Sequence, residues 1–299
     1  MKKLITGLLM LAICFGMLAG YANEAKGVIN IATKPRAEGF ILGEILGLLI
    51  ENETDYAVKI TKGIAGGTSN IHPAMVKGDF DLYPEYTSTG YVMVLGHSAA
   101  GISDDEIWDT LIREYNEIHD MTWIAQYGFN NTYCIAVREE VAREYNLKTT
   151  SDLAVVAGEL VFGANPDYLE RADGFPVLAE TYGLNFKDVV QIDVGLRWVA
   201  IDTGSIDVTN GFTTDAELAT CNAVVLEDDL QLQVNYFCST VVRNDALEKY
   251  PQLEAVLRKM EGLINETEMS MLNYQVSIEG MDERDVARDF LIQKGLLGK

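Results

Sequence analysis

The tyrosine-rich stretch FDLYPEYTSTGY, residues 80–91, contains side chains whose type and spacing could bind a ligand. It holds Tyr83, Tyr86 and Tyr91 in a chain that is otherwise strongly acidic. A tyrosine ring can pack in a core, or it can offer the negative face of its π-system to a cation. We expect Tyr83 and Tyr91 to pack. Tyr86 follows Pro84, where we expect the strand to end, and is predicted to face a cleft.

Motifs of common enzyme classes are absent from the sequence, which has no Gly-x-Ser-x-Gly elbow, P-loop, His-Glu-x-x-His or Cys-x-x-Cys. The three histidines, His72, His97 and His119, are expected to be surface or helix-capping groups. With 45 acidic residues a catalytic carboxylate pair stays open, although no spacing indicates one. The sequence therefore predicts a protein that is not an enzyme and that has no cofactor and no metal.

The first 22 residues have the pattern of a secretory signal peptide. Lys2 and Lys3 precede an apolar run, and Gly20-Tyr21-Ala22 offers a cleavage site. An uncleaved anchor is the alternative. A lipid anchor is not supported, because Tyr21 occupies the place where a lipoprotein has cysteine. We expect export to the periplasm or to the outer face of the cytoplasmic membrane.

The charge of the chain limits its partners. The formal net charge is −22, and loss of the two signal lysines makes the rest of the chain more negative still. Nucleic acids and anionic lipids carry the same sign, so neither is an expected partner. Cys134, Cys221 and Cys238 remain, and this odd number leaves at least one thiol without an intramolecular disulfide.

Short β-rich runs alternate with amphipathic helical patterns along the chain. Residues 28–33 and 57–61 read as strands around a helix at 38–53, and the C-terminal part is predicted to be helical from Ala246 to Leu296. Such alternation is typical of an α/β fold with mostly parallel sheets. No linker rich in Pro, Gly or Ser divides the chain, which is compatible with two lobes joined by paired crossings.

Several segments resemble, in order along the chain, the extracytoplasmic binding proteins of ABC importers for glycine betaine, carnitine and choline. They include ATKPRAEGFILGEIL, DLYPEYTST, YGFNNTYCIAV, FGANPDYLERADGFP, GFTTD and LNYQVSIEG. The resemblance implies a two-lobed periplasmic-binding-protein fold of type II with a ligand cleft at the hinge. Lobe 1 would comprise 23–129 and 237–299, and lobe 2 would comprise 130–236. The implied partners are a permease and its ATPase.

A quaternary ammonium group has no N–H to donate, so a box of aromatic faces recognises it better than hydrogen-bond acceptors do. The resemblance assigns the cation box to Tyr86, Tyr133, Phe212 and Tyr236. It assigns the ligand's carboxylate to Lys34, Arg171 and Thr89, and it places Asn131 and Tyr168 in the pocket wall. Each tyrosine taken alone is better explained as a half-buried packing residue, and it is the set in its motif context that favours the box. Arg171 could instead pair with Glu170 or Asp173.

The chain departs from the family pattern at three places. Phe212 stands where tyrosine is common, Ala37-Glu38-Gly39 replaces Thr-Glu-Gln and is expected to lose a polar contact, and the run after Tyr236 differs. Glycine betaine, proline betaine, carnitine and choline all remain candidate ligands, and Lys34 with Arg171 favours a carboxylate-bearing one. The rivals are a polyamine or cationic amino acid held by Glu85 and Asp81, and an exported carboxylate-dependent enzyme.

Overall fold

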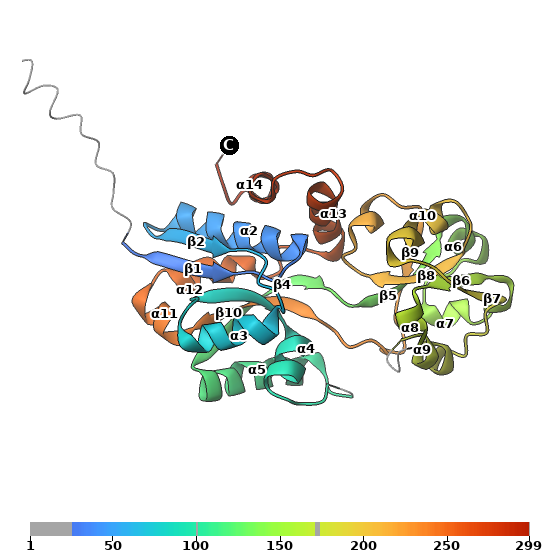
Figure 1. The fold of residues 1–299 in the computed structure, drawn as a ribbon, viewed down its shortest axis with the longest axis horizontal. Helices are drawn as coiled ribbons and strands as arrows, with labels where there is room; N and C mark the ends of the chain where they lie inside the picture. Colours follow the sequence, from blue (N-terminus) through green and yellow to red (C-terminus); the bar gives the residue numbers. More distant parts are fainter. Residues whose placement is uncertain (1–25, 100, 171–173, 299) are drawn as a thin grey trace, which may run out of the picture.

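The structure is a computed structural model that describes residues 26–99, 101–170 and 174–298. Figure 1 shows two lobes, each built around a sheet, joined by two extended crossings of the chain. The predicted two-lobed α/β architecture is therefore confirmed. The predicted signal peptide, 1–22, lies outside the described residues. In the described part of the chain, every helix is too short or too polar to span a membrane.

The first lobe contains a five-stranded sheet with strand order β2-β1-β3-β10-β4. Its strands are β1 (Val28–Ala32), β2 (Ala57–Thr61), β3 (Leu82–Tyr86), β4 (Met121–Asn130) and β10 (Phe237–Arg243). The second lobe contains a five-stranded sheet with strand order β7-β6-β8-β5-β9. Its strands are β5 (Tyr133–Arg138), β6 (Val161–Ala164), β7 (Asp188–Gln191), β8 (Val208–Phe212) and β9 (Ala223–Leu226).

Both sheets are mixed, so the expectation of mostly parallel sheets is wrong. β1 is parallel to β2 and β3, whereas β10 is antiparallel to β3 and β4. In the second lobe β6 is parallel to its neighbours and β5 is antiparallel to β8 and β9. β5 and β10 each enter a lobe straight from a crossing. They therefore lack the helical crossover connection that makes neighbouring strands parallel.

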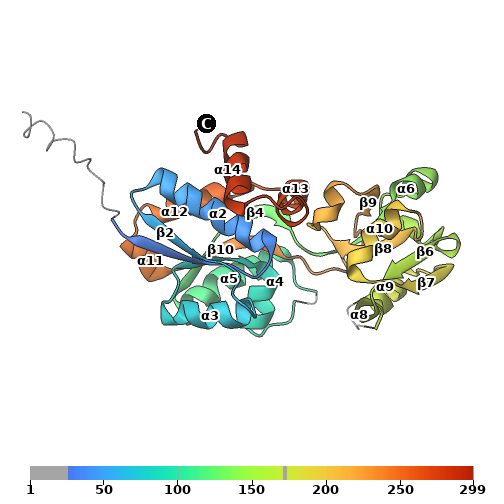
Figure 2. The same ribbon diagram turned by 45° about the horizontal axis from the view of Figure 1, so that its top comes forward.

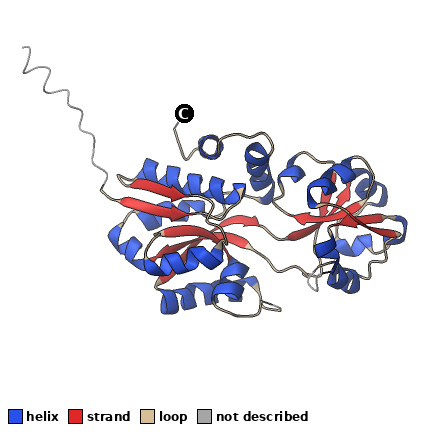
Figure 3. Cartoon of the chain, in the orientation of Figure 1, coloured by secondary structure: helices blue, strands red, loops and turns tan. Residues whose placement is uncertain are grey.

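Helices flank the strands of both lobes, and Figure 3 shows the strands running through the middle. In the first lobe they are α2 (Ala37–Glu53), α3 (Thr68–Lys77), α4 (Thr87–Thr89), α5 (Asp104–His119), α11 (Asn244–Lys249), α12 (Leu253–Leu257), α13 (Glu266–Ser277) and α14 (Glu283–Gln293). In the second lobe they are α6 (Glu139–Tyr145), α7 (Thr150–Leu153), α8 (Pro166–Glu170), α9 (Phe175–Tyr182) and α10 (Arg197–Asp202). Single helical turns of other types occupy Gly90–Val94, Ala157–Glu159, Val194–Leu196, Ala216–Ala219 and Arg258–Met260.

α2 is the central helix of the first lobe. Ile41, Leu42 and Ile45 are fully buried and belong to the same apolar cluster as Ile29 and Ile31 of β1. α14 packs on the other side of α2, as Figure 2 shows, which explains why most of α2 is apolar. The first turn of α2 is thereby fixed next to the crossings, where it supplies residues to the site described below.

The two crossings run beside each other and are hydrogen-bonded. Asn131 N donates to the carbonyl of Tyr236 at 3.1 Å, and Tyr236 N donates to Oδ1 of Asn130 at 2.7 Å. Thr132 Oγ1 donates to the carbonyl of Val234 at 2.7 Å. Side chains on the crossings therefore keep a fixed position relative to each other.

Besides the two crossings, α13 also links the lobes, through hydrogen bonds. It lies over their junction in both ribbon views (Figures 1 and 2). Ser270 Oγ donates to the carbonyl of Asp215 at 2.9 Å, and Asn273 Nδ2 donates to the carbonyl of Thr214 at 2.9 Å. Both acceptors follow β8 of the second lobe, so a C-terminal helix of the first lobe braces the wall of the second.

His72 does not have the surface or helix-capping role that the sequence predicted for it. This α3 side chain is half-buried, and its ring lies edge-on to His119 at 4.5 Å and to Tyr115 at 5.6 Å between centroids. Burial, with His119 as the second cause, lowers the pKa of His72 from 6.5 to about 4. The folded protein therefore keeps this ring neutral at pH values where the unfolded chain protonates it.

We expect His72 to make folding stability fall as the pH is lowered from 6.5 towards 4. In that window the unfolded chain binds a proton that the folded state does not, so protonation favours unfolding. The fall ends below about pH 4, where both states are protonated. Urea unfolding at pH 7 and pH 5 should show a smaller loss for His72→Phe than for wild type. An equal loss in the two proteins would contradict this assignment.

Candidate ligand-binding site

A cavity of about 800 Å³ lies between the two lobes. Its walls come from the loop before α2, the ends of β3 and β8, both crossings and α13. The lining side chains include Lys34, Arg36, Glu38, Tyr86, Thr89, Asn131, Tyr133, Phe212, Asp215, Glu217, Tyr236, Asn273 and Ser277. Seven of the nine predicted site residues are among them, from segments far apart in sequence: Lys34, Tyr86, Thr89, Asn131, Tyr133, Phe212 and Tyr236.

Tyr133 and Phe212 form one aromatic wall. They lie opposite each other on the antiparallel strands β5 and β8, and this pairing brings their rings together. The rings are stacked, with centroids 4.8 Å apart and an interplanar angle of 24°. Tyr168, predicted to be a wall residue, does not line the cavity in this structure. It is buried and packs against Tyr133 at 5.4 Å between centroids, so it supports the wall from behind.

Tyr86 lies at the end of β3 and faces the cavity. The strand does not end at Pro84 as expected, because Pro84 is paired opposite Thr240 of β10. Proline removes one N–H from the ladder, but its backbone angle is compatible with an extended strand. The phenol of Tyr86 donates a hydrogen bond to Oε1 of Glu38. Burial, followed by the charge of Glu38, raises the pKa of Tyr86 well above its usual value, so the phenol stays a donor.

Lys34, predicted to meet the ligand's carboxylate, already has an acidic partner. Its Nζ forms an ion pair with Oε1 of the fully buried Glu85 and lies 4.6 Å from the centroid of the Tyr86 ring. Glu85 also accepts hydrogen bonds from Thr68 Oγ1 at 2.6 Å and from the backbone N of Tyr86 at 2.7 Å. Any ligand carboxylate at Lys34 would therefore share the ammonium with Glu85.

The two acids on which the polyamine alternative depends do not line the cavity. Glu85 is held as described, and Asp81 accepts hydrogen bonds from the backbone N and Nδ2 of Asn30 at 2.7 and 3.1 Å. Of the predicted carboxylate-binding residues, Thr89 lines the cavity at the end of α4, and Arg171 lies outside the described residues. The assignment of Arg171 stays a prediction.

Glu38 is a site residue that sequence reasoning missed. The change to Ala37-Glu38-Gly39 was expected to remove a polar contact, yet Glu38 itself lines the cavity and is only 5% exposed. It accepts hydrogen bonds from Tyr86, from Asn131 Nδ2 at 2.8 Å and from Asn273 Nδ2 at 3.2 Å. A Cβ at Gly39 would lie 2.8 Å from the carbonyl oxygen of Lys34, so glycine permits this close approach of the helix start.

Asp215 is the second missed residue, and it positions Phe212. Its Oδ2 accepts a hydrogen bond from the backbone N of Phe212 at 3.1 Å and forms an ion pair with the buried Arg197. The sequence motif GFTTD could have indicated this residue, because it contains both Phe212 and Asp215. Arg197 could not be found in this way because it lies on α10, 18 residues earlier in the chain.

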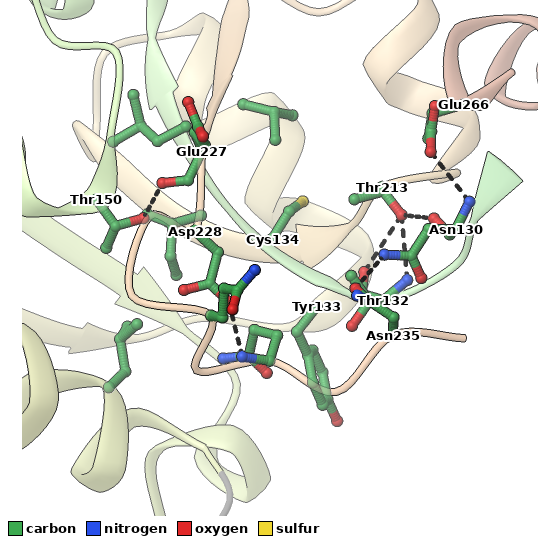
Figure 4. Close-up of a pocket in the computed structure, with 16 residues that line it drawn as sticks. Asn130, Thr132, Tyr133, Cys134, Thr150, Thr213, Glu227, Asp228, Asn235 and Glu266 are labelled. Carbon is green, nitrogen blue, oxygen red and sulfur yellow. Dashed lines mark hydrogen bonds between the residues drawn. The ribbon is translucent and has the colours of Figure 1, made fainter. Parts of the chain in front are cut away.

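A smaller cavity of about 420 Å³ is lined by residues of both crossings, of β5 and of β9, and Figure 4 shows the lining side chains. Hydrogen bonds link the polar side chains around it. Asn130 Nδ2 donates to Asn235 Oδ1 at 2.6 Å, and Asn130 N donates to Glu266 Oε1 at 3.0 Å. Tyr133 is the aromatic side chain among the described residues that line it, and these residues do not form ring walls like those of the larger cavity.

The three cysteines of the described residues are unreactive thiols, and the acids there do not group into a metal site. Cys134, Cys221 and Cys238 are free thiols in this structure. Burial raises the pKa of all three, that of Cys221 to about 11, so they stay protonated at neutral pH. In the described part of the chain, no three His, Cys, Asp or Glu side chains are grouped so that they could hold a metal ion.

Comparison with known proteins identifies the family. The model of the substrate-binding domain of ABC-type glycine betaine transport systems matches residues 27–293. The ergothioneine transport permease/ergothioneine binding protein of Helicobacter pylori is 38% identical over 96% of this chain, which spans about half (51%) of that protein's length.

Two further relatives match over almost their whole lengths. The carnitine transport binding protein of Listeria monocytogenes is 34% identical, with 96% of this chain and 93% of that protein covered. A crystal structure of a glycine betaine/carnitine/choline ABC transporter is 29% identical and superimposes with a TM-score of 0.85, covering 90% of this chain and 99% of the other. This chain therefore belongs to the family of substrate-binding domains of ABC-type glycine betaine transport systems, which are transport binding proteins and not enzymes.

Proposed function

We propose that this protein captures a quaternary ammonium solute in the cavity between its lobes and delivers it to the permease and ATPase of an ABC importer, for osmoprotection. The observation that carries the proposal is the stacked pair of Tyr133 and Phe212 on the cavity wall, with Tyr86 and Tyr236 on the other segments that line it. Ring faces attract a methylated ammonium and exclude water from it, and each contact contributes about 0.5–2 kcal/mol.

Closure of the two lobes around the ligand would give the conformation that the permease recognises. A ligand that contacts both lobes favours the closed state by its differential affinity for that state. Tyr86 and Glu38 belong to the first lobe, Phe212 and Asp215 to the second, and all four line one cavity. We infer the lobe boundaries from the crossings, with 23–129 and 237–299 in lobe 1 and 130–236 in lobe 2. We likewise infer an extracytoplasmic location.

The candidate ligands are glycine betaine, proline betaine, carnitine and choline. Ergothioneine joins them, because the relative named for it is 38% identical and because, like glycine betaine and carnitine, it is a trimethylammonium carboxylate. Carnitine is supported by the 34% identical relative. Lys34, Thr89 and Arg171 would meet the carboxylate of a zwitterionic ligand, and arginine suits this role through its paired donors.

Isothermal titration calorimetry of the purified protein with a ligand panel tests the proposal. The panel comprises these five compounds together with spermidine and arginine. We expect saturable binding of at least one quaternary ammonium compound and no binding of spermidine or arginine, whose nitrogens all carry N–H groups. Binding of spermidine or arginine alone would contradict the proposed ligand class. Recovery of a chemically altered ligand after prolonged incubation would instead support the enzyme alternative.

A further inference from the structure

The carboxylate of Glu38 is surrounded by donors from three different parts of the fold. It lies in the first turn of α2, and its hydrogen bonds come from Tyr86 at the end of β3, Asn131 on the first crossing and Asn273 on α13. A phenol and two amides are all neutral groups. Glu38 therefore gains hydrogen bonds from these partners but no opposite charge.

Other carboxylates in and near the site, buried or half-buried, have basic partners. Glu85 pairs with Lys34, and Asp215 pairs with Arg197. Further along α2, Glu44 pairs with Lys62 at 2.8 Å and with Arg284 at 2.9 Å. Among the described residues, no Lys, Arg or His nitrogen lies within 4.0 Å of a Glu38 oxygen. A buried carboxylate without an ion-pair partner leaves negative charge at the cavity wall, where a cation is stabilised.

The hydrogen bond to Tyr86 extends this effect to the ring. A phenol that donates to a carboxylate has a more electron-rich ring, which attracts a cation more strongly. The ring already holds one cation, because Lys34 Nζ lies 4.6 Å from its centroid. The charges of Lys34 and Glu85 cancel as a pair, and the Arg36 side chain that also lines the cavity is exposed to solvent. Glu38 is therefore the buried charge on this side of the cavity that has no ion-pair partner among the described residues.

We propose that Glu38 is a specificity-determining residue, which supplies the counter-charge for the ligand's quaternary ammonium and holds Tyr86 and Asn131 in position. This inference rests on the proposed function. It orients the ligand, since the ammonium lies next to the carboxylate of Glu38. It also ranks ligands, because a net cation gains more from Glu38 than a zwitterion does.

The test compares wild type with Glu38→Gln, which keeps the size of the side chain and removes its charge. Affinities are measured by calorimetry for choline, glycine betaine and 3,3-dimethylbutanol, the uncharged isostere of choline. We expect choline to lose at least about tenfold in affinity, glycine betaine to lose less, and the isostere to change by less than about twofold. A charge-independent, purely structural role would weaken all three ligands equally.

Glu44→Gln is the matched control, because Glu44 lies on the same helix, is buried to a similar extent and does not line the cavity. It should leave the ratio of choline to isostere affinity unchanged. If Glu38→Gln does not fold, Tyr86→Phe removes the phenol that links ring and carboxylate, and it should lower the same ratio. An unchanged ratio in the tested variant overturns the inference alone. Wild-type protein that binds no quaternary ammonium compound overturns the proposed function, and the inference falls with it.

Discussion

Replacement of Tyr133 by alanine is expected to weaken binding of a quaternary ammonium ligand by about thirtyfold, which corresponds to about 2 kcal/mol. Tyr133 is stacked on Phe212 and backed by Tyr168, so its loss removes one face of the box and leaves Phe212 unsupported. It also opens the cavity wall to water, which lowers the attraction between the remaining rings and the cation.

Calorimetry with the ligand that wild type binds best would measure this effect. Tyr133→Phe is the control, because it keeps the ring and removes only the hydroxyl, and its affinity should stay within about threefold of wild type. Phe212 shows that a ring without a hydroxyl is already used in this wall. Equal affinity of Tyr133→Ala and wild type would show that the ligand does not contact this ring, and the box would have to be placed elsewhere.

Gly128→Ala is expected to reduce folding stability by about 3 kcal/mol or more, by strain and by overpacking together. Gly128 has φ of +109°, a conformation that side chains other than glycine rarely adopt. A Cβ there would lie 2.8 Å from the carbonyl oxygen of Ile264 and 3.0 Å from Cα of Gly262. These backbone atoms cannot move easily, because Gly262 N and Ile264 N donate to carbonyls of β4 at 2.9 Å each.

Thermal unfolding would show this loss as a fall in Tm of roughly 10 °C for a chain of this size. Gly96→Ala is the matched control, since Gly96 also has a positive φ, of +75°, but no atom of the described residues lies within 4 Å of the added Cβ. It should cost only about 1 kcal/mol, the contribution of the backbone conformation alone. Similar Tm values for the two variants would mean that the backbone of residues 262–264 shifts to accommodate the new side chain at little cost in stability.

The sequence allowed the general fold and most of the candidate box to be predicted. Local patterns indicate where strands and helices form, because burial of one face requires a periodic spacing of apolar residues. The ordered motifs added residues such as Tyr86, Tyr133 and Phe212, and the structure brings these to one cavity. The C-terminal part is helical as predicted, although it divides into shorter helices at positions such as Gly262 and Gly280, which have positive φ.

The direction of strand pairing could not be predicted in the same way. The period of a strand is the same in parallel and antiparallel sheets, so alternation alone does not distinguish them. Strand order also depends on which lobe each segment joins after a crossing. β10 follows β9 along the chain but lies between β3 and β4 in the other lobe. The position of β10 therefore depends on how the whole chain folds and not on the local sequence of the strand.

By itself, the sequence determined the element pattern, the family and the aromatic side chains that we propose for binding a cation, because these depend on residue type and local spacing. Only the tertiary structure decided which charges are neutralised. It pairs Lys34 with Glu85 and Asp215 with Arg197, and it gives Glu38 neutral partners from β3, the first crossing and α13. Electrostatic interactions depend on distance and burial in space, and residues far apart in the chain set both.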